Sequence, residues 1–498
     1  MFSLVYYGII TFLAGYINIW EDEVYSLNTT SGNLSYALNQ SLNFEEQSPV
    51  YFLLLTIWRA ISDSILWARL FSILSIVLSQ FLLFRFIEKL AGRQIANISS
   101  ILLLLNLFTI FTILEIRLFA FLLLLSLLIT IFFYNTYYSN KITTGSRILF
   151  IFLTITGLFT QDFFGFLVAA FAVVLMVEKN WRSFRLYILD MIIPLFLVLL
   201  FIPHIIESIN LHISVVPEYN KTFVKLVFEA INVLINRVIT YLIPLNFSII
   251  KIWIFMGFFF ILLFASIDYT KFKRDFRSLS PFIVMTLVIL SFFFVVHLIF
   301  GIVYSAYKYT AVLFIPLSIL MMVLFKFFKP WLLNFWLVLL MIFYLYADFK
   351  GYRDLYKVKD FRSLCHYIKM TEEKEEPIYV YRNISAENMS FYYDGINKIL
   401  PVPKAFSYNK AFGPEQWKIN VQDLNELYRK LMKYSNFYVV IDNSPLRGVE
   451  ESKTTLLEFL LHNFNLSVEK SFKGKIIVYK FSNNDELHIG ETSVLDDY

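Results

Sequence analysis

The sequence predicts a mainly α-helical, polytopic membrane protein that ends in a small α/β domain. Hydrophobic residues make up 58% of the 498 residues and charged residues only 16%, against about 25% charged residues in soluble domains. Several apolar runs reach the roughly 18 residues that indicate a membrane-spanning helix. Beyond residue 347, charged residues return and the apolar runs become short. These observations predict a transmembrane bundle over residues 1–347 and a separate domain over 348–498.

The apolar runs predict about eleven membrane spans. They lie at 2–19, 65–87, 94–114, 118–138, 147–161, 163–178, 186–203, 248–267, 280–300, 309–327 and 331–347. The segment 49–61 is apolar but too short to span, so we expect an interfacial helix there, with Tyr51 and Trp58 as aromatic anchors. It lies within a first loop of 20–64.

Basic residues predict the sidedness of these spans. They gather in alternate loops, at 85–93, 141–147, 179–185, 271–277 and 326–329. The positive-inside rule places such loops in the cytoplasm. The first loop, the stretch 204–247 and, because the number of spans is odd, the C-terminal domain are then extracytoplasmic.

The C-terminal domain shows alternating strand and helix patterns. Apolar runs predict strands at 377–382, 437–442 and 475–481, and helical periodicity predicts helices at 360–371, 421–434 and 450–463. This domain has no glycine-rich phosphate loop, which argues against nucleotide binding. The single cysteine, Cys365, excludes an internal disulfide framework. The net charge of +5 is explained by the basic loops, so no nucleic-acid partner is predicted.

An acidic segment follows the first span and points to chemistry. The chain reads Trp20-Glu21-Asp22-Glu23 there, and its first Lys or Arg is Arg59. Ionisable residues at the membrane are costly, so they indicate a functional site. The alternative is an ordinary solvated helix end.

Short motifs along the chain carry a family resemblance. In order they are Asp22-Glu23, Gln47-Ser48-Pro49-Val50-Tyr51, Asp63-Ser64 with Ala68-Arg69-Leu70, Glu115-Ile116-Arg117 and Lys308-Tyr309. In this order and spacing the chain resembles the GT-C superfamily of membrane glycosyltransferases, in the branch of protein O-mannosyltransferases and the lipid A aminoarabinose transferase. It departs from that pattern where Ser48 replaces a proline, Asp162 replaces a Thr-His pair and Lys308 replaces an arginine.

The resemblance implies a reaction and roles for these residues. Such enzymes take a sugar from a polyprenyl-phosphate carrier at the outer face and invert its anomeric centre. Asp22 would be the general base, with Glu23 its partner or an acceptor-positioning group. Arg117, Lys308 and Arg69 would bind the carrier phosphate. The residues that would bind substrate are Gln47, Tyr51, Glu115, Asp162 and Tyr309.

The resemblance also bears on cofactors, partners and location. Asp22 and Glu23 offer the hard oxygen ligands that a divalent metal prefers, but this branch is viewed as metal-independent, so we expect no cofactor. The expected partners are a polyprenyl-phosphate sugar, a lipid, glycan or protein acceptor, and membrane lipid, in a bacterial inner (plasma) membrane. Two other functions stay open: a transporter or flippase of lipid-linked sugar, and an inactive relative that acts as a scaffold.

Overall fold

The chain divides into two compact units. The computed structural model describes residues 2–215, 222–242, 257, 259, 261–300, 307–355, 359–408, 416–443 and 450–483. Unit 1 comprises Met1–Gly15, Thr30–Leu42 and Glu46–Gly351, and unit 2 comprises Tyr16–Thr29, Asn43–Glu45 and Tyr352–Tyr498. The short segment that carries the acidic residues is therefore built into the same unit as the C-terminal domain.

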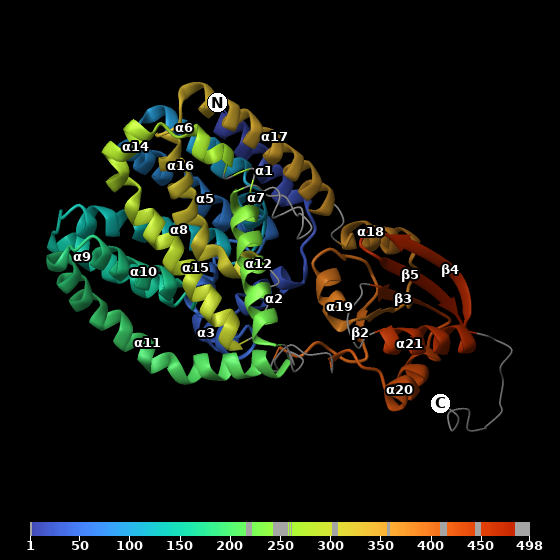
Figure 1. Ribbon diagram of the computed structural model, residues 1–498. Helices are drawn as coiled ribbons and strands as arrows, with labels where there is room; N and C mark the ends of the chain where they lie inside the picture. Colours follow the sequence, from blue (N-terminus) through green and yellow to red (C-terminus); the bar gives the residue numbers. More distant parts are fainter. Residues whose placement is uncertain are drawn as a thin grey trace. The chain divides into compact units, whose positions relative to one another are not determined.

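Unit 1 is a helical bundle (Figure 1). The helices that lie wholly or mostly in it are α1 (Phe2–Tyr16), α3 (Leu34–Asn43), α4 (Val50–Arg59), α5 (Ile65–Ala91), α6 (Arg93–Leu105), α7 (Leu107–Leu114), α8 (Phe119–Phe133), η1 (Tyr134–Tyr138), α9 (Thr144–Leu158), α10 (Phe164–Val177), α11 (Trp181–Val215), α12 (Phe223–Leu242), α14 (Tyr269–Asp275), η2 (Phe276–Ser278), α15 (Ser280–Phe300), η3 (Tyr307–Leu313), α16 (Phe314–Phe325) and α17 (Pro330–Leu355).

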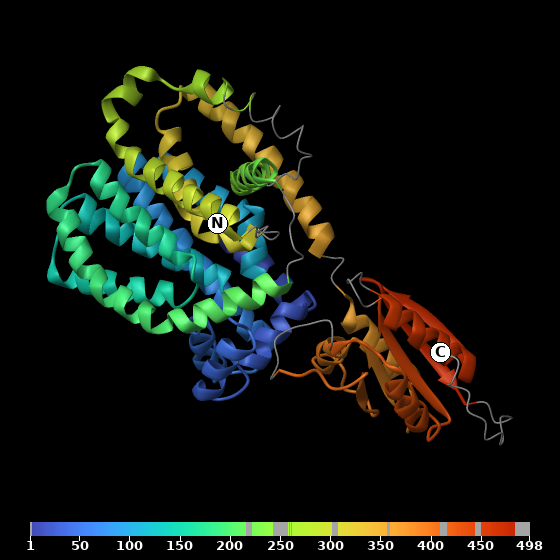
Figure 2. The same ribbon diagram turned by 60° about the horizontal axis from the view of Figure 1, so that its bottom comes forward.

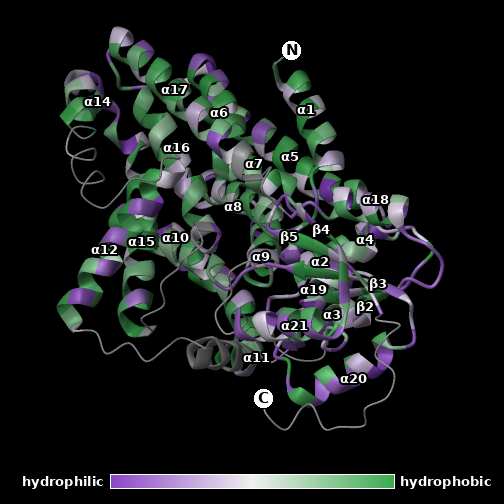
Figure 3. Ribbon diagram, turned by 90° about the vertical axis from the view of Figure 1, so that its right-hand side faces the viewer, coloured by the Kyte–Doolittle hydropathy of each residue, from purple (hydrophilic) through white to green (hydrophobic). Residues whose placement is uncertain are grey.

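Among the described residues, six helices are long and apolar enough to cross a membrane. They are Ile65–Ala91, Phe119–Tyr138, Trp181–Pro203, Ser280–Ile299, Lys308–Phe325 and Pro330–Gly351. The number rises to eight if α1 with α2 (Glu21–Thr29) and α6 with α7 each form one broken span. The hydropathy of these helices is predominantly apolar along their length (Figure 3). These are the features of a multi-pass membrane protein.

Two predicted spans form helices that are shorter than a bilayer crossing needs. Helix α9 has 15 residues and α10 has 14, whereas a span needs about 20. The longest helix, α11, contains Pro194 and Pro203 and curves along its length (Figures 1 and 2), because a proline inside a helix removes a backbone hydrogen bond. The predicted span 248–267 lies largely outside the described residues.

Helix α12 is a feature that the sequence reading missed. The sequence analysis places residues 223–242 in the extracytoplasmic stretch 204–247, where Lys225, Glu229 and Arg237 interrupt the apolar run. The structure makes them a helix of 20 residues. Ala230, Ile239 and Tyr241 are buried, so this helix packs within the bundle.

A buried asparagine joins three helices at the break between α6 and α7. The Asn106 side-chain oxygen accepts the Phe108 N–H at 2.9 Å and so caps α7. Its amide nitrogen donates to the Tyr241 carbonyl oxygen at 2.8 Å and to the Tyr344 hydroxyl at 3.3 Å. The polar groups exposed by the helix break are thus satisfied inside the protein, as they must be at membrane depth.

Unit 2 contains a five-stranded mixed sheet in the order β2-β1-β3-β5-β4. The strands are β1 (Ile378–Tyr381), β2 (Ile399–Val402), β3 (Asn436–Asp442), β4 (Asn465–Phe472) and β5 (Ile476–Ser482). Strands β2, β1 and β3 are parallel, and β5 and β4 are antiparallel to their neighbours. Because Tyr381 pairs with both Val402 and Ile441, the carboxyl ends of the parallel strands lie at one edge.

Helices cover both faces of this sheet. One core contains residues of α20 (Val421–Leu431) and α21 (Glu450–Asn463), and the other contains residues of α18 (Phe361–Thr371) and α19 (Asn383–Ser390). Cys365 is 1% exposed within the second core. The predicted α/β domain, its three strands and its three helices are confirmed. Strands β2 and β4 and helix α19 were not predicted.

Candidate functional site

Two of the three predicted phosphate-binding cations, Arg117 and Lys308, lie near the start of α8 in unit 1. Arg117 lies in the turn between α7 and α8 and is 7% exposed. The Lys308 ammonium lies 5.6 Å from the centre of the Phe119 ring, in the first turn of α8. On the neighbouring helix α5, Ser72 donates to the Glu115 carbonyl oxygen at 2.8 Å, one turn after Arg69. Elements far apart in sequence therefore bring positive charges to one region of unit 1.

Arg69 also has a structural contact. Its side chain is buried and donates from Nη1 to the Ala14 carbonyl oxygen at 2.6 Å, at the end of α1. The last carbonyl groups of a helix have no partner within the helix, and a cation there is favourable. This contact joins α1 to α5.

The first loop meets the turn between α9 and α10. Ser48 donates to Asp162 Oδ1 at 2.8 Å, and the Val50 N–H donates to the Phe159 carbonyl oxygen at 2.9 Å. Gln47 precedes Ser48 in this loop, and its N–H donates to the Ser41 carbonyl oxygen at 2.9 Å. The two motif positions that depart most from the family pattern, Ser48 and Asp162, are bonded to each other.

Two predicted aromatic residues lie in different surroundings. Segment 49–61 forms helix α4, as expected, but Tyr51 is 1% exposed and packs against Phe52 and Phe71. The interpretation of Tyr51 as an exposed anchor was wrong, because α4 turns that face into the protein. Trp58 stacks on Trp67 with ring centres 4.7 Å apart. Tyr309 is 43% exposed, next to Lys308 on η3.

The acidic segment forms the first turn of α2 in unit 2. Glu23 is 1% exposed, and its Oε2 accepts the Trp20 N–H at 3.2 Å. A glutamate at the third helical position that reaches back in this way caps the helix start. Asp22 is half-buried, and its carbonyl oxygen accepts the Ser26 hydroxyl at 3.2 Å. Glu23 thus supports the start of the helix, and Asp22 lies beside it in the same turn.

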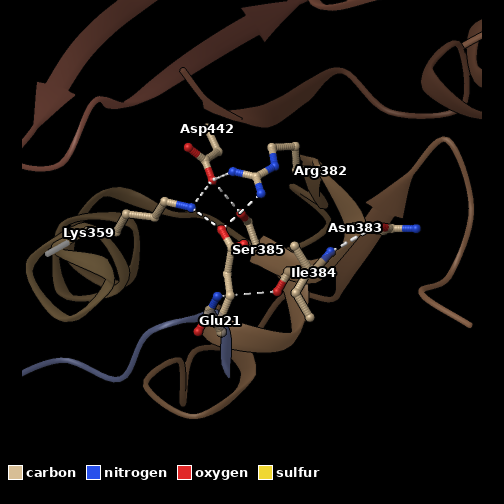
Figure 4. Close-up of polar contacts among 8 residues, drawn as sticks. Glu21, Lys359, Arg382, Asn383, Ile384, Ser385 and Asp442 are labelled. Carbon is tan, nitrogen blue, oxygen red and sulfur yellow. Dashed lines mark hydrogen bonds and ion pairs between the residues drawn. The ribbon is translucent and has the colours of Figure 1, made fainter. Parts of the chain in front are cut away.

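Glu21, the third acid of this turn, belongs to a charged cluster that the sequence reading did not identify. The cluster consists of Glu21, Lys359, Arg382, Ser385 and Asp442 (Figure 4). Arg382 donates from Nη1 to Asp442 at 2.7 Å and from Nη2 to Glu21 at 2.9 Å. Lys359 approaches the same two carboxylates from the other side, bonding Asp442 at 2.5 Å and also bonding Glu21. The Ser385 hydroxyl donates to Asp442 at 3.0 Å.

The cluster lies at the carboxyl ends of β1 and β3. Arg382 follows β1 directly and Asp442 is the last residue of β3. The chain leaves β1 into α19 on one face of the sheet and leaves β3 towards α21 on the other face. Such a switch point is where open α/β sheets bind ligands. In this protein the Glu21 carboxylate lies at the position where such a sheet would bind a ligand.

Burial and backbone geometry show that Arg382 is held firmly. Its side chain is 1% exposed, its guanidinium lies 5.4 Å from the centre of the Trp417 ring, and its φ is +65°. A side-chain-bearing residue adopts that conformation at a cost of about 1–3 kcal/mol, and does so mainly where its surroundings enforce it. The ion pairs to two carboxylates provide such surroundings.

The sequence held a partial signal for this cluster. Strands were predicted to end at 382 and 442, and the ends of adjacent parallel strands share an edge, so Arg382 and Asp442 could have been paired. Glu21 could not, because it is separated from Arg382 by 361 residues. Within the described residues, no group of three or more His, Cys, Asp or Glu side chains has the arrangement of a metal site.

Comparison with known proteins gives the fold. No protein-family model and no curated protein matches the sequence. Among solved structures, ArnT from Cupriavidus metallidurans in the apo state is similar over 96% of this chain and 97% of its own, with a TM-score of 0.57 and 11% identity. ArnT from the same organism bound to undecaprenyl phosphate covers 96% and 98%, with a TM-score of 0.58 and 12% identity. The chain therefore has the fold of these two ArnT structures, in agreement with the fold that the sequence resemblance implies.

Proposed function

We propose that this protein is an integral membrane glycosyltransferase that moves a sugar from a polyprenyl-phosphate carrier to an acceptor. The observation that carries the proposal is the ArnT fold over 96% of the chain, seen in one case with undecaprenyl phosphate bound. Arg117, which is buried, and the half-buried Lys308 lie near the start of α8 and support it, because a lipid phosphate needs fixed positive charge in a region poor in water.

The proposed reaction is an inverting displacement. The acceptor hydroxyl or amine attacks the anomeric carbon, the bond from that carbon to the phosphate oxygen breaks, and polyprenyl phosphate leaves with the electron pair. Asp22 takes the acceptor proton as general base. Arg117 and Lys308, with Arg69, stabilise the charge that grows on the leaving phosphate. Glu23 assists Asp22 by fixing the helix turn that carries it.

The remaining motif residues have proposed binding roles. Gln47 and Asp162 offer polar groups to a sugar or acceptor, and Asp162 is bonded to Ser48, the residue that follows Gln47. Glu115 and Tyr309 flank Arg117 and Lys308 in sequence, and Tyr51 shapes the wall behind the first loop. No divalent metal is part of this proposal.

The membrane arrangement is part of the proposal. The chain crosses a bacterial inner membrane about eleven times, and residues 1–347 form the catalytic module. Residues 348–498 form a domain on the extracytoplasmic side, where the transfer takes place. Alternating basic loops support this orientation.

The deciding experiment measures sugar transfer by the purified protein in lipid. A panel of radiolabelled polyprenyl-phosphate sugars is incubated with the wild type, with Asp22→Asn and with Asp394→Asn, whose side chain is 76% exposed in the same unit. We expect transfer or release of label by the wild type and by Asp394→Asn, and none by Asp22→Asn. Activity retained in Asp22→Asn would remove the proposed base. No turnover in folded wild type across the panel would refute the enzyme.

Binding of the carrier tests the cations separately. We expect Arg117→Ala and Lys308→Ala each to weaken binding of undecaprenyl phosphate about 10-fold or more, since hydrogen bonds to charged groups contribute about 1.5–3 kcal/mol. Lys326→Ala is the control, because Lys326 pairs with Asp275 in a loop predicted to be cytoplasmic. Equal affinity in all variants would exclude these residues from the phosphate site.

A further inference from the structure

The charged cluster of unit 2 fixes the residue that precedes the proposed base. Glu21 and Asp22 are adjacent in the first turn of α2. The Glu21 carboxylate is bonded by Lys359 and Arg382, which are 338 and 361 residues away in sequence. The sheet of this domain is formed by residues 378–482 alone and does not include the acidic segment. The bonds to Glu21 therefore suggest a role other than stabilising the sheet.

Other contacts hold the same segment along its length. Asn18 donates to Asp360 Oδ1 at 3.1 Å and accepts the Arg362 N–H at 3.3 Å. The Ile19 N–H donates to the Tyr392 hydroxyl at 2.7 Å. The Tyr25 ring stacks on Phe406 with centres 5.7 Å apart. The segment is thus attached to the C-terminal fold at several points before and after Asp22.

We propose that Lys359, Arg382 and Asp442 are positioning residues for Asp22. Lys359 and Arg382 bind the Glu21 carboxylate, and Asp442 holds both cations in place. Together they fix the orientation of the first turn of α2, which carries Asp22. This inference rests on the proposed function of Asp22 as base, and it gives the C-terminal domain a role in the reaction.

The parts of the cluster have distinct tasks. The Asp442 carboxylate is fully buried, forms ion pairs with Arg382 and Lys359, and accepts a hydrogen bond from the Ser385 hydroxyl. Arg382, held by Asp442 and Trp417, is then a fixed fork whose second nitrogen is aimed at Glu21. A planar guanidinium bonded at both ends sets an orientation, which a flexible surface pair does not. Glu21 is the outermost member, with its side chain 22% exposed.

Glu21 is therefore the member to substitute first. Glu21→Gln removes its charge but leaves Asp442 paired with both cations, so the sheet keeps its core. A misplacement of about 1 Å can cost about 100-fold in rate. We expect Glu21→Gln to lower kcat about 10- to 100-fold with little change in KM, and Glu21→Asp to recover part of the loss.

A matched ion pair at the opposite edge of the same sheet serves as the control. Lys480 lies 2.7 Å from Glu376, whose side chain is 3% exposed. Glu376→Gln should disturb the unit at least as much as Glu21→Gln does and leave kcat at the wild-type value. Equal losses of kcat in both variants would mean that the cluster only stabilises the domain, which would overturn the inference.

Hydrogen exchange of α2 gives a readout that does not need turnover. We expect Glu21→Gln and Arg382→Gln to raise the exchange of amides in residues 22–29, and Glu376→Gln to leave them unchanged. Unchanged exchange in Glu21→Gln would overturn the inference. If Asp22→Asn is inactive while Glu21→Gln has wild-type kcat, the inference fails and the proposed function stands. If Asp22→Asn is active, Asp22 is not the base and the inference fails with it, while transfer by the protein stands.

Discussion

At the scale of the residue, three adjacent acids have three different surroundings. The Glu21 carboxylate pairs with Lys359 and Arg382, the Glu23 carboxylate accepts the Trp20 N–H, and Asp22 is half-buried. Composition and spacing cannot separate these roles, because the residues differ only in what they contact. The Glu23 contact is that of a helix cap, and Asp22 as base stays a proposal from the family resemblance.

Glu23 offers a test that separates helix capping from chemistry. Glu23→Gln keeps an oxygen that can accept the Trp20 N–H, whereas Glu23→Ala removes the cap, which costs about 1 kcal/mol. We expect Glu23→Ala to raise amide exchange in α2 and lower transfer, and Glu23→Gln to change neither by more than a few-fold. A large loss of transfer in Glu23→Gln, with normal exchange, would show that the Glu23 charge takes part in the reaction.

Glu387 provides a pH-dependent test in unit 2. Burial raises the pKa of Glu387 above its ordinary value, although a hydrogen bond with Tyr408 opposes this. In the window between its ordinary pKa and its folded pKa, the folded state binds more protons than the unfolded state, so stability falls as the pH rises. We expect Glu387→Gln to remove this slope in unfolding measured from pH 4 to 8. An unchanged slope would contradict the assignment.

At the scale of the element, packing decides what the sequence pattern leaves open. The sequence predicts strands with continuous apolar runs, such as 437–442, and helices with clear apolar periodicity, such as 360–371. In both cases the spacing of apolar residues shows which side chains will be buried. Strand β4 was missed because it is an edge strand with mostly exposed polar residues. Helix α12 was not predicted, because Lys225, Glu229 and Arg237 interrupt its apolar run and only the fold shows that it packs within the bundle.

The junction at Asn106 tests how α6, α7 and α12 are joined. Asn106→Ala removes the cap of α7 and the bond to the Tyr241 carbonyl oxygen, leaving buried polar groups that cost about 1–3 kcal/mol each. We expect a clear drop in the thermal unfolding midpoint in detergent. Tyr344→Phe, which loses only one hydroxyl at the same junction, should show a smaller drop. A larger drop in the midpoint for Tyr344→Phe than for Asn106→Ala would show that Asn106 is not the main link between these helices.

At the scale of the whole molecule, charge predicts the orientation and distant contacts define the candidate site. The alternating basic loops could be read from the sequence because sidedness depends on local composition. The charged cluster could not be read fully, because its partners are hundreds of residues apart and only the fold brings them together. The cations near α8 were named from the family resemblance, and their proximity in unit 1 came from the structure.

Side-specific labelling tests the orientation. In a Cys365→Ser background, Met432→Cys places a thiol at an exposed position of unit 2, and Arg182→Cys places one at an exposed position in the first turn of α11, within the basic segment 179–185. We expect a membrane-impermeant maleimide to label Met432→Cys in intact cells with a permeable outer envelope, and Arg182→Cys only after the inner membrane is opened. The opposite pattern would invert the proposed topology.

The buried thiol of Cys365 can report local unfolding of the C-terminal fold in the unmodified protein. It is the only thiol in the protein, it is 1% exposed in the core between α18 and the sheet, and burial raises its pKa to about 12. A thiol that is both covered and protonated reacts slowly, because the thiolate is the nucleophile. Its modification rate therefore measures how often the C-terminal fold opens while the membrane helices remain intact. Acceptors, inhibitors and lipid mixtures can be ranked by their effect on that single rate, without a radiolabel or an engineered probe.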